Sequence, residues 1–540
     1  MAVGSFRDLE RSYFDLRWHL DPVAATAAGL TDHDHRFGRF GPAALPPHLA
    51  ALKSMATALE EATVVDLHEE IDRTALLDEI RVTIHRFERE RPQARNPEFW
   101  LTHLFEGLHG LVRRPGADSA ATATAVIQRL EDVPGLLQDA RAALTDPVPL
   151  FAATALQVLP GGEALIREIR SHYEGRDPGE SRAERLGAAA DAAVAALQAF
   201  ARDVGLWLDE TPGAFALGEE SFNFLLHYEH ALRETAPELW RYGLHLQAEV
   251  TADLERLARE LGGDDWSTLV RRLRQDHPSS DGLVAAYDAG MQRARRFVER
   301  HDLAPIPSAP LRVIPTPEFM RPLLPFAAYE RSGPYATDQT GLFYVTLPDR
   351  GLKARQQAEL LEDHCTHGIA GTALHEGYPG HHLQLVHAQR LPGHTRKNIW
   401  TPLTVEGWAL YCEEMMGEQG FYDTPEERLF QRMGLLWRAV RILLDVGLHT
   451  RGMTIDEAVR RLVDGVHLDR ANAESEVRRY CATPGYQLCY AVGRRELLRL
   501  RDDARAAQGP AFTLRGFHET VLSYGGLPVT LMRWGMGLDE

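Results

Sequence analysis

Three histidines and a glutamate lie within one short segment, His375 to His382, which reads HEGYPGHH. In a helical His-Glu-x-x-His sequence, two histidines one turn apart bind one Zn²⁺ while the glutamate acts as a general base. Here His381 lies six residues after His375, and His382 lies seven residues after it. A straight helix would place neither later imidazole beside that of His375. The spacing therefore predicts a metal site only if the helix is interrupted, with His381 as the second ligand and His382 as the alternative.

Pro379 and Gly380 supply such an interruption. Proline lacks an amide hydrogen, and its ring clashes with the carbonyl oxygen four residues earlier, which belongs to His375. Glycine permits backbone angles that other residues avoid. We expect a kink or bulge that absorbs the two extra residues and brings His381 back to His375, with Glu376 beside them. The competing interpretation, a helix end with surface histidines, is less favoured because so many metal-binding side chains gather in one segment.

A third ligand is predicted downstream, in the segment TVEGWALYCEE. A catalytic zinc site needs three protein ligands and one open position. Glu406 opens a helix-like stretch there, about 30 residues after the first histidine. This order and spacing of ligands resembles the layout of the gluzincins. The alternative for Glu406 is a solvated acid stabilised by the dipole at a helix N-terminus. Glu413 falls on the same predicted helix face and is a candidate for orienting a metal ligand.

The composition describes a folded protein without an excess of cations. The chain has 540 residues, 44% of them hydrophobic and 25% charged, and a formal net charge of -18. This acidic balance argues against nucleic acid or an anionic membrane as the main partner. The four cysteines form no CxxC pair, and we find neither a secretory signal nor an apolar run of about 18 residues. These features favour a cytoplasmic monomer or homodimer.

Apolar residues recur at helical spacing through most of the chain, which predicts a mainly α fold. The segment Leu303–Asp349 differs, because it is rich in proline and contains LRVIPT and GLFYVTL, which are typical of short strands. We expect an N-terminal helical lobe over residues 1–300 and a catalytic lobe over residues 301–540 that holds the small sheet and the HEGYPGHH site. The edge of the GLFYVTL strand would accept an extended peptide.

Several segments resemble the bacterial family of domain-of-unknown-function 885, whose members carry His-Glu-x-x-Pro-Gly-His-His. The resemblance rests on HEGYPGHHLQ, VEGWALYCE, LLDVGLHTRGMT and EVRRYCATPGYQLCYAVG, and it covers nearly the whole chain. It implies a large two-lobed helical fold similar to carboxypeptidase Taq and neurolysin, with a metal on the floor of a deep central cleft. It also implies that His375, His381 and Glu406 bind one zinc ion. Glu376 would be the general base. Mn²⁺, Fe²⁺ and Co²⁺ suit the same ligand types.

Arg479 and Tyr490 complete the predicted site as hydrogen-bond donors to an oxyanion. Tyr490 resembles the tyrosine near the metal in carboxypeptidase Taq-like enzymes. Asp445 and His449, in the segment LLDVGLH, are candidates for orienting the metal ligands. The predicted activity is zinc-dependent hydrolysis of short peptides, of carboxypeptidase or oligopeptidase type. In it Glu376 takes a proton from zinc-bound water as that water attacks a carbonyl group.

Two other functions fit the same residues. A metal-dependent biosynthetic enzyme, such as an amidohydrolase, lyase or cyclase, would use the same groups on a small amino-acid-like metabolite, because a fold does not fix the bond cleaved. A catalytically inactive peptide-binding protein is the third possibility. The intact set of histidines and glutamates argues against it.

Overall fold

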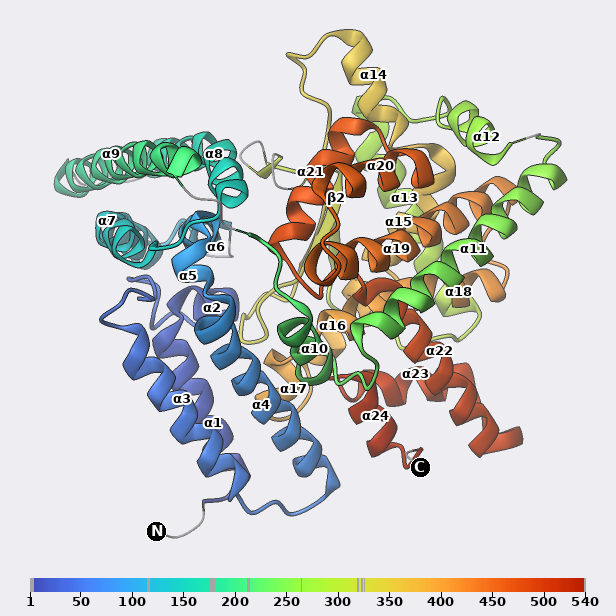
Figure 1. Ribbon diagram of the computed structural model, residues 1–540, viewed down its shortest axis with the longest axis horizontal. Helices are drawn as coiled ribbons and strands as arrows, with labels where there is room; N and C mark the ends of the chain where they lie inside the picture. Colours follow the sequence, from blue (N-terminus) through green and yellow to red (C-terminus); the bar gives the residue numbers. More distant parts are fainter. Residues whose placement is uncertain are drawn as a thin grey trace. The chain divides into compact units, whose positions relative to one another are not determined.

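The computed structural model describes residues 4–113, 117–174, 180–210, 214–263, 265–317, 320–321, 324 and 326–538. Within these ranges the chain is mainly helical with one small sheet, which confirms the predicted fold class (Figure 1). Its contacts divide it into two compact units. The first comprises Met1–Phe215, Pro317–Leu323 and Ser332–Asp338, and the second Ala216–Thr316, Leu324–Arg331 and Gln339–Glu540. These units divide after Phe215; the predicted lobes, with their boundary at residue 300 and a cleft, stay a prediction.

The first unit consists of helices, several of which start at a polar capping residue. Ser5, Asp66 and Ser119 accept backbone hydrogen bonds at the starts of α1, α4 and α7. The helices are α1 (Phe6–Leu20), α2 (Pro22–Ala27), α3 (Leu45–Glu60), α4 (Leu67–His85), α5 (Pro92–Arg95), α6 (Pro97–Arg113), α7 (Ala120–Ala143), α8 (Pro149–Glu174) and α9 (Glu180–Glu210). Figure 1 shows α7, α8 and α9 side by side. Together with α6 they enclose a hydrophobic cluster that includes the fully buried Leu130 and Phe200.

Helix α8 is long and apolar enough to cross a membrane by length and composition alone, and it is the one such helix among the described residues. Ala152, Leu165 and Ile166 of this helix belong to the hydrophobic cluster of the first unit. A core helix passes the same test, and this packing places part of α8 in the core of the first unit. The sequence search missed it because Pro160 and Glu163 interrupt its apolar run.

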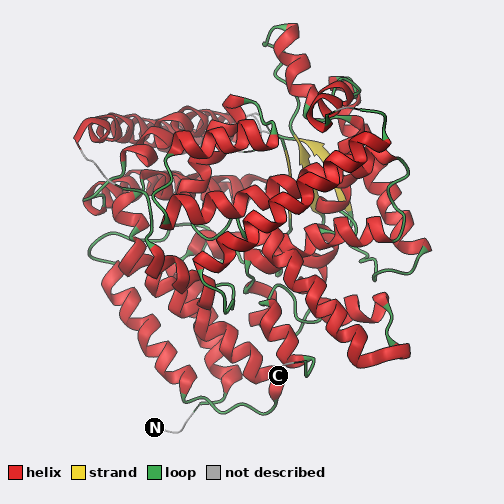
Figure 2. Ribbon diagram, turned by 45° about the vertical axis from the view of Figure 1, so that its right-hand side comes forward, coloured by secondary structure: helices red, strands yellow, loops and turns green. Residues whose placement is uncertain are grey.

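The second unit holds the sheet and the remaining helices. The strands are β1 (Leu311–Pro315), β2 (Ala327–Glu330) and β3 (Gly341–Val345). The helices are α10 (Glu219–Tyr228), α11 (Ala236–Glu260), α12 (Trp266–Leu273), α13 (Leu283–Arg300), α14 (Ala354–Glu362), α15 (Thr366–Glu376), α16 (His381–Gln389), α17 (Thr395–Asn398), α18 (Pro402–Glu418), α19 (Pro425–Thr450), α20 (Ile455–Val466), α21 (Arg470–Ala482), α22 (Cys489–Gln508), α23 (Leu514–Leu522) and α24 (Val529–Gly535). Figure 2 shows how small the sheet is beside these helices.

The sheet corrects the expectation that the GLFYVTL strand offers an open edge. Its order is β1-β3-β2, with β1 parallel and β2 antiparallel to the central β3. Both sides of β3 are therefore paired, and its residues Phe343, Tyr344 and Val345 are buried. One edge of the sheet is β2, which contacts Glu376 of the predicted metal segment. Sequence reasoning did not predict this strand, because the segment AAYE has no alternating apolar pattern.

The sheet also anchors the helix that carries the metal motif. Phe343 and Val345 of β3 share a hydrophobic cluster with Leu283 and Tyr287 of α13 and with Ile369 of α15. Each fully buried apolar side chain of this size contributes about 1.5 to 3 kcal/mol relative to exposure. This packing fixes α15 against α13 and the sheet, so the C-terminal end of α15 has a rigid support.

Candidate metal centre

The HEGYPGHH segment forms the end of one helix and the start of another. Helix α15 ends at Glu376, and α16 begins at His381. The expected interruption at Pro379 and Gly380 is confirmed, but it is a complete break between two helices rather than a bulge within one. Because the break lets the second helix take a new direction, His381 escapes the constraint of helical spacing and returns to His375.

Gly380 allows the close approach on which this break depends. Its amide donates to the carbonyl of Leu374 over 3.0 Å. A Cβ atom at this position would lie 1.8 Å from the carbonyl oxygen of His375, so no other residue fits without a shift of the backbone. The indole of Trp408, on α18, donates to the carbonyl of Pro379 over 2.9 Å. The break is thereby tied to the helix that carries Glu406.

Glu406 is positioned by a tight crossing of α18 and α22. Thr401 caps α18 by accepting from the amide of Leu403, and Pro402 occupies its first turn. Gly407 faces Gly493 of α22. A Cβ atom added to Gly493 would lie 1.9 Å from the carbonyl oxygen of Leu403. Two glycines thus let the helix backbones touch, which brings the start of α22 close to Glu406.

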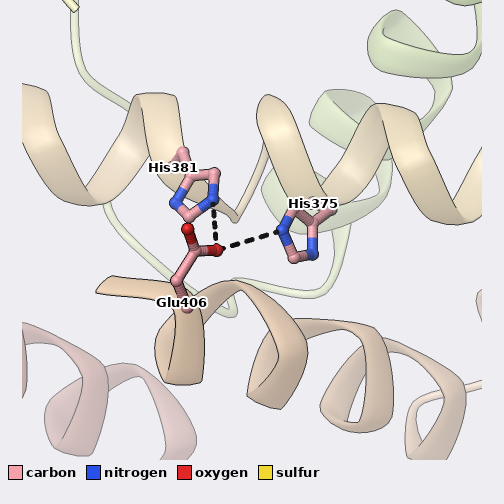
Figure 3. A group of neighbouring side chains, drawn as sticks. All are labelled: His375, His381 and Glu406. Carbon is pink, nitrogen blue, oxygen red and sulfur yellow. Dashed lines mark ion pairs between the residues drawn. The ribbon is translucent and has the colours of Figure 1, made fainter. Parts of the chain in front are cut away.

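The three predicted ligands converge on one point (Figure 3). Oε2 of Glu406 lies 3.8 Å from Nε2 of His375 and 3.4 Å from Nε2 of His381. One ligand atom from each residue lies within 4.8 Å of the other two, and all three residues are buried. Atoms bound to a tetrahedral zinc ion at about 2.0 to 2.1 Å are about 3.3 Å apart. The donor set and its spacing therefore fit a divalent cation.

The two histidines differ in their support. Nδ1 of His375 lies 2.8 Å from Oε1 of Glu413, which fixes the ring and directs Nε2 towards Glu406. Nδ1 of His381 is buried without a hydrogen-bond partner among the described residues. Glu406 is held from the other side, because the Tyr486 hydroxyl donates to its Oε1 over 2.5 Å. The orienting role predicted for Glu413 is thus matched by its contact with His375.

The electrostatics of the site reflect these contacts. Burial alone would lower the pKa of His375, but hydrogen bonds with Glu406 and Glu413 outweigh it and raise that pKa to about 9. Burial opposes ionisation of Glu406, yet the two imidazoles hold its pKa well below the ordinary value. Burial and the Glu406 charge raise the pKa of Tyr486 well above its ordinary value, so this phenol stays protonated and donates. Glu406 is therefore held in its ionised form, as a carboxylate, at the place where a cation would bind.

Glu376 and His382 lie next to this group but point to other partners. Oε2 of Glu376 accepts a hydrogen bond from the backbone amide of Tyr329, on β2, over 3.0 Å. Nδ1 of His382 lies 3.2 Å from the Tyr329 hydroxyl, and its Nε2 lies 3.2 Å from the carbonyl of Ala309. His382 is fully buried. Both of its ring nitrogens are engaged, so the geometry groups His381, and not His382, with His375.

Other predicted residues lie outside the ligand contacts. The Arg479 guanidinium donates to Glu476 over 2.8 Å, and the Asp445 carboxylate accepts from the amides of Gly485 and Leu488 over 3.0 Å each. Burial raises the pKa of Asp445 to about 7. Asp445 therefore shapes the turn before α22 and does not touch an imidazole.

His449 and Tyr490 also lie apart from the ligand atoms. Nε2 of His449 lies 3.0 Å from the carbonyl of Tyr480, so this imidazole supports α21 instead of a metal ligand. The Tyr490 ring centroid is 6.1 Å from that of Tyr486, which itself binds Glu406. Sequence reasoning missed the role of Tyr486. The available signal was its place in the segment PGYQLCYAVG beside the predicted Tyr490, in the turn that leads into α22.

Two solved structures share the fold over almost the full length of both chains. One, from Shewanella oneidensis, is described as a candidate lipoprotein of unknown function; its TM-score is 0.83, with 22% identity over 99% of this chain and 100% of that one. The other, a candidate lipoprotein from Colwellia psychrerythraea, has a TM-score of 0.86 and 18% identity over 99% of each chain. Because a lipoprotein is attached to a membrane, these findings contradict the cytoplasmic location predicted from the sequence.

A third structure, described as a candidate oligoendopeptidase F from Bacillus anthracis, aligns with a TM-score of 0.33 and 12% identity over 91% of this chain and 92% of that one. A likeness this weak carries no argument about activity. A comparison with curated proteins gave no match. The family described as bacterial protein of unknown function (DUF885) matches residues 22–536. This match spans most of the sequence and agrees with the resemblance drawn from its motifs, and the chain therefore belongs to the DUF885 family.

Proposed function

We propose that this protein is a zinc-dependent hydrolase that cleaves short peptides. The observation that carries the proposal is the convergence of His375, His381 and Glu406, with all three ligand atoms within 4.8 Å and Glu376 next to His375 in the sequence. A zinc ion bound there supplies Lewis acidity and lowers the pKa of a water molecule that it holds. The finer prediction of a two-lobed, metallopeptidase-like fold belongs to the same proposal.

Glu376 supplies the general base. Its Oε2 atom is held by the amide of Tyr329, which leaves Oε1 to accept a proton and pass it to the leaving amine. Tyr490 is the proposed donor to the oxyanion, and its ring is held beside Tyr486. Arg479 is the second proposed donor, since one of its N–H groups donates to Glu476 and the guanidinium carries further N–H donors.

The position of β2 supports a peptide as substrate. This strand forms one edge of the sheet, and the amide of Tyr329 that binds Glu376 belongs to it. An extended peptide added to such an edge forms backbone hydrogen bonds with it. Its carbonyl groups would then lie beside the general base. Zinc is favoured over Mn²⁺, Fe²⁺ and Co²⁺ because a glutamate directly follows the first histidine, as in zinc hydrolases.

Metal content and peptide cleavage test this proposal together. The wild-type protein should carry one zinc per chain and cleave members of a short-peptide library. His375→Ala, His381→Ala and Glu406→Ala should each lose both. His382→Ala is the matched control, because this neighbouring imidazole binds Tyr329 and Ala309 instead, and it should retain zinc.

Two outcomes would contradict the proposal. Zinc without cleavage of any peptide would keep the centre and move the function to small-metabolite chemistry. Loss of metal in His382→Ala with retention in His381→Ala would show that the ligand set is assigned wrongly.

A further inference from the structure

We propose that a cluster of arginines beside the metal centre binds the terminal carboxylate of the substrate, which makes the protein a carboxypeptidase. The cluster consists of Arg438 and Arg441 of α19, Arg479 of α21 and the ring of Tyr490 of α22. This inference rests on the proposed hydrolase function and deepens it. Binding of the terminal carboxylate would direct cleavage to the C-terminal end of a peptide and prevent cleavage of its interior bonds.

The cluster is continuous with the metal ligands through two aromatic rings. Tyr486 donates to Glu406, and its ring centroid lies 6.1 Å from that of Tyr490. The guanidinium carbons of Arg441 and Arg438 lie 4.9 Å and 5.8 Å from the centroid of the Tyr490 ring. These are distances at which a cation is attracted to an aromatic ring. Tyr490 therefore lies between the metal ligands and a pair of fixed positive charges.

The positive charge of the cluster is only partly balanced. Glu476 accepts from Arg441 over 3.0 Å and from Arg479 over 2.8 Å, so one carboxylate serves two guanidinium groups. Arg438 donates only to the carbonyl of Gly434, and its Nε atom is buried without a partner among the described residues. No carboxylate of the described part of the chain pairs with Arg438. Two guanidinium groups thus share one carboxylate and the third has none, and the surplus charge favours an anion.

The chemistry of this surplus selects a carboxylate. A guanidinium group presents a planar fork of N–H donors that matches the two oxygens of a carboxylate. Arg441 is rigid, because it is buried and donates to the Tyr480 hydroxyl over 2.8 Å, whereas the Arg479 side chain is 41% exposed. The cluster therefore combines a rigid, buried arginine, Arg441, with an exposed one, Arg479.

Binding to an inactive variant tests the carboxylate site separately from turnover. Glu376→Gln protein, immobilised with its metal, is offered a library of random tetrapeptides as free acids and the same library as C-terminal amides. Mass spectrometry of the retained peptides should show about a tenfold or greater preference for free acids. Arg438→Gln added to this variant should abolish the preference, and Arg438→Lys should restore part of it. Arg428→Gln, on an exposed arginine of the same helix, should leave it unchanged.

Each other result overturns a specific part of the inference. Equal retention of acids and amides, or retention of neither, overturns the carboxylate site whatever the wild-type protein cleaves. Retention of amides only when they contain aspartate or glutamate would overturn the terminal carboxylate as the source of the charge. A preference for free acids in binding, with no cleavage by the wild-type protein, would instead contradict the proposed hydrolase function and leave the carboxylate site supported.

Discussion

The hydrophobic cluster of the first unit and the metal centre of the second are both buried, but they bury different chemistry. The cluster around Leu130 and Phe200 consists of apolar side chains, and their removal from water stabilises the fold. Around His375 and Glu406, ionisable groups lie at a depth where each is costly unless it is paired. Such a contrast is typical of a functional site, because buried groups with shifted pKa values gather at functional sites.

Glu376→Gln is expected to give the largest effect, because it removes the proposed general base and leaves the proposed ligands in place. The value of kcat should fall by about 10² to 10⁴ fold, the contribution typical of a positioned base. Glutamine keeps an oxygen that accepts from the amide of Tyr329, so the β2 contact survives. Steady-state cleavage of a good library peptide, with metal content determined in parallel, provides the measurement. Full activity with the metal retained would remove Glu376 from the mechanism.

Leu130→Ala tests the other side of the comparison. It should lower the free energy of unfolding by about 2 to 5 kcal/mol, since it empties space in a closely packed cluster. Leu206→Ala is the matched control, because that side chain is 64% exposed, and its effect should stay within about 0.5 kcal/mol. Denaturant unfolding followed by circular dichroism measures both. Zinc affinity of folded Leu130→Ala should equal that of the wild type; a large loss would show that the first unit also shapes the metal centre.

The site could be predicted from the sequence wherever residue chemistry is local. His375, Glu376 and the break at Pro379 and Gly380 follow from known preferences of neighbouring residues. The ligand role of Glu406 followed from its place after the first motif and from family resemblance. The structure places Glu406 beside both imidazoles, and Trp408, only two residues further, ties α18 to the break.

The remaining contacts depend on helix crossings that no local pattern encodes. Asp445 and His449 have the residue types that support metal ligands, yet they support the turn before α22 and the end of α21. The approach of Tyr486 to Glu406 depends on the contact between Gly407 and Gly493, which lie far apart in the sequence. Strand β2 was missed for a related reason: its pairing with β3, and not its own pattern, makes it a strand.

Glu413→Gln sharpens the comparison within the metal centre, where Nδ1 of His375 has a buried carboxylate partner and Nδ1 of His381 has no partner among the described residues. Loss of the negative charge should weaken the orientation and basicity of His375 and reduce zinc affinity by about 10 to 100 fold. Competition with a chelator of known affinity measures the change. Glu414→Gln is the control: it is the next residue on α18 but pairs with Arg432 and Arg494. A comparable loss of zinc affinity in Glu414→Gln would mean that the helix, and not the Glu413 contact, controls the metal.

Tyr486→Phe should give the smallest effect, because Glu406 loses one hydrogen bond to Oε1 while its Oε2 atom still faces both imidazoles. Zinc affinity should fall by about tenfold or less, because a typical hydrogen bond contributes about 0.5 to 1.5 kcal/mol and the Oε2 contacts remain. Tyr490→Phe is the companion variant, since it keeps the ring beside Arg441 but removes the proposed oxyanion donor. It should lower kcat and leave zinc affinity unchanged. If Tyr486→Phe instead lowers kcat at full zinc occupancy while Tyr490→Phe has no effect, the donor to the oxyanion is Tyr486. Tyr490 then serves only as the ring against which Arg438 and Arg441 pack.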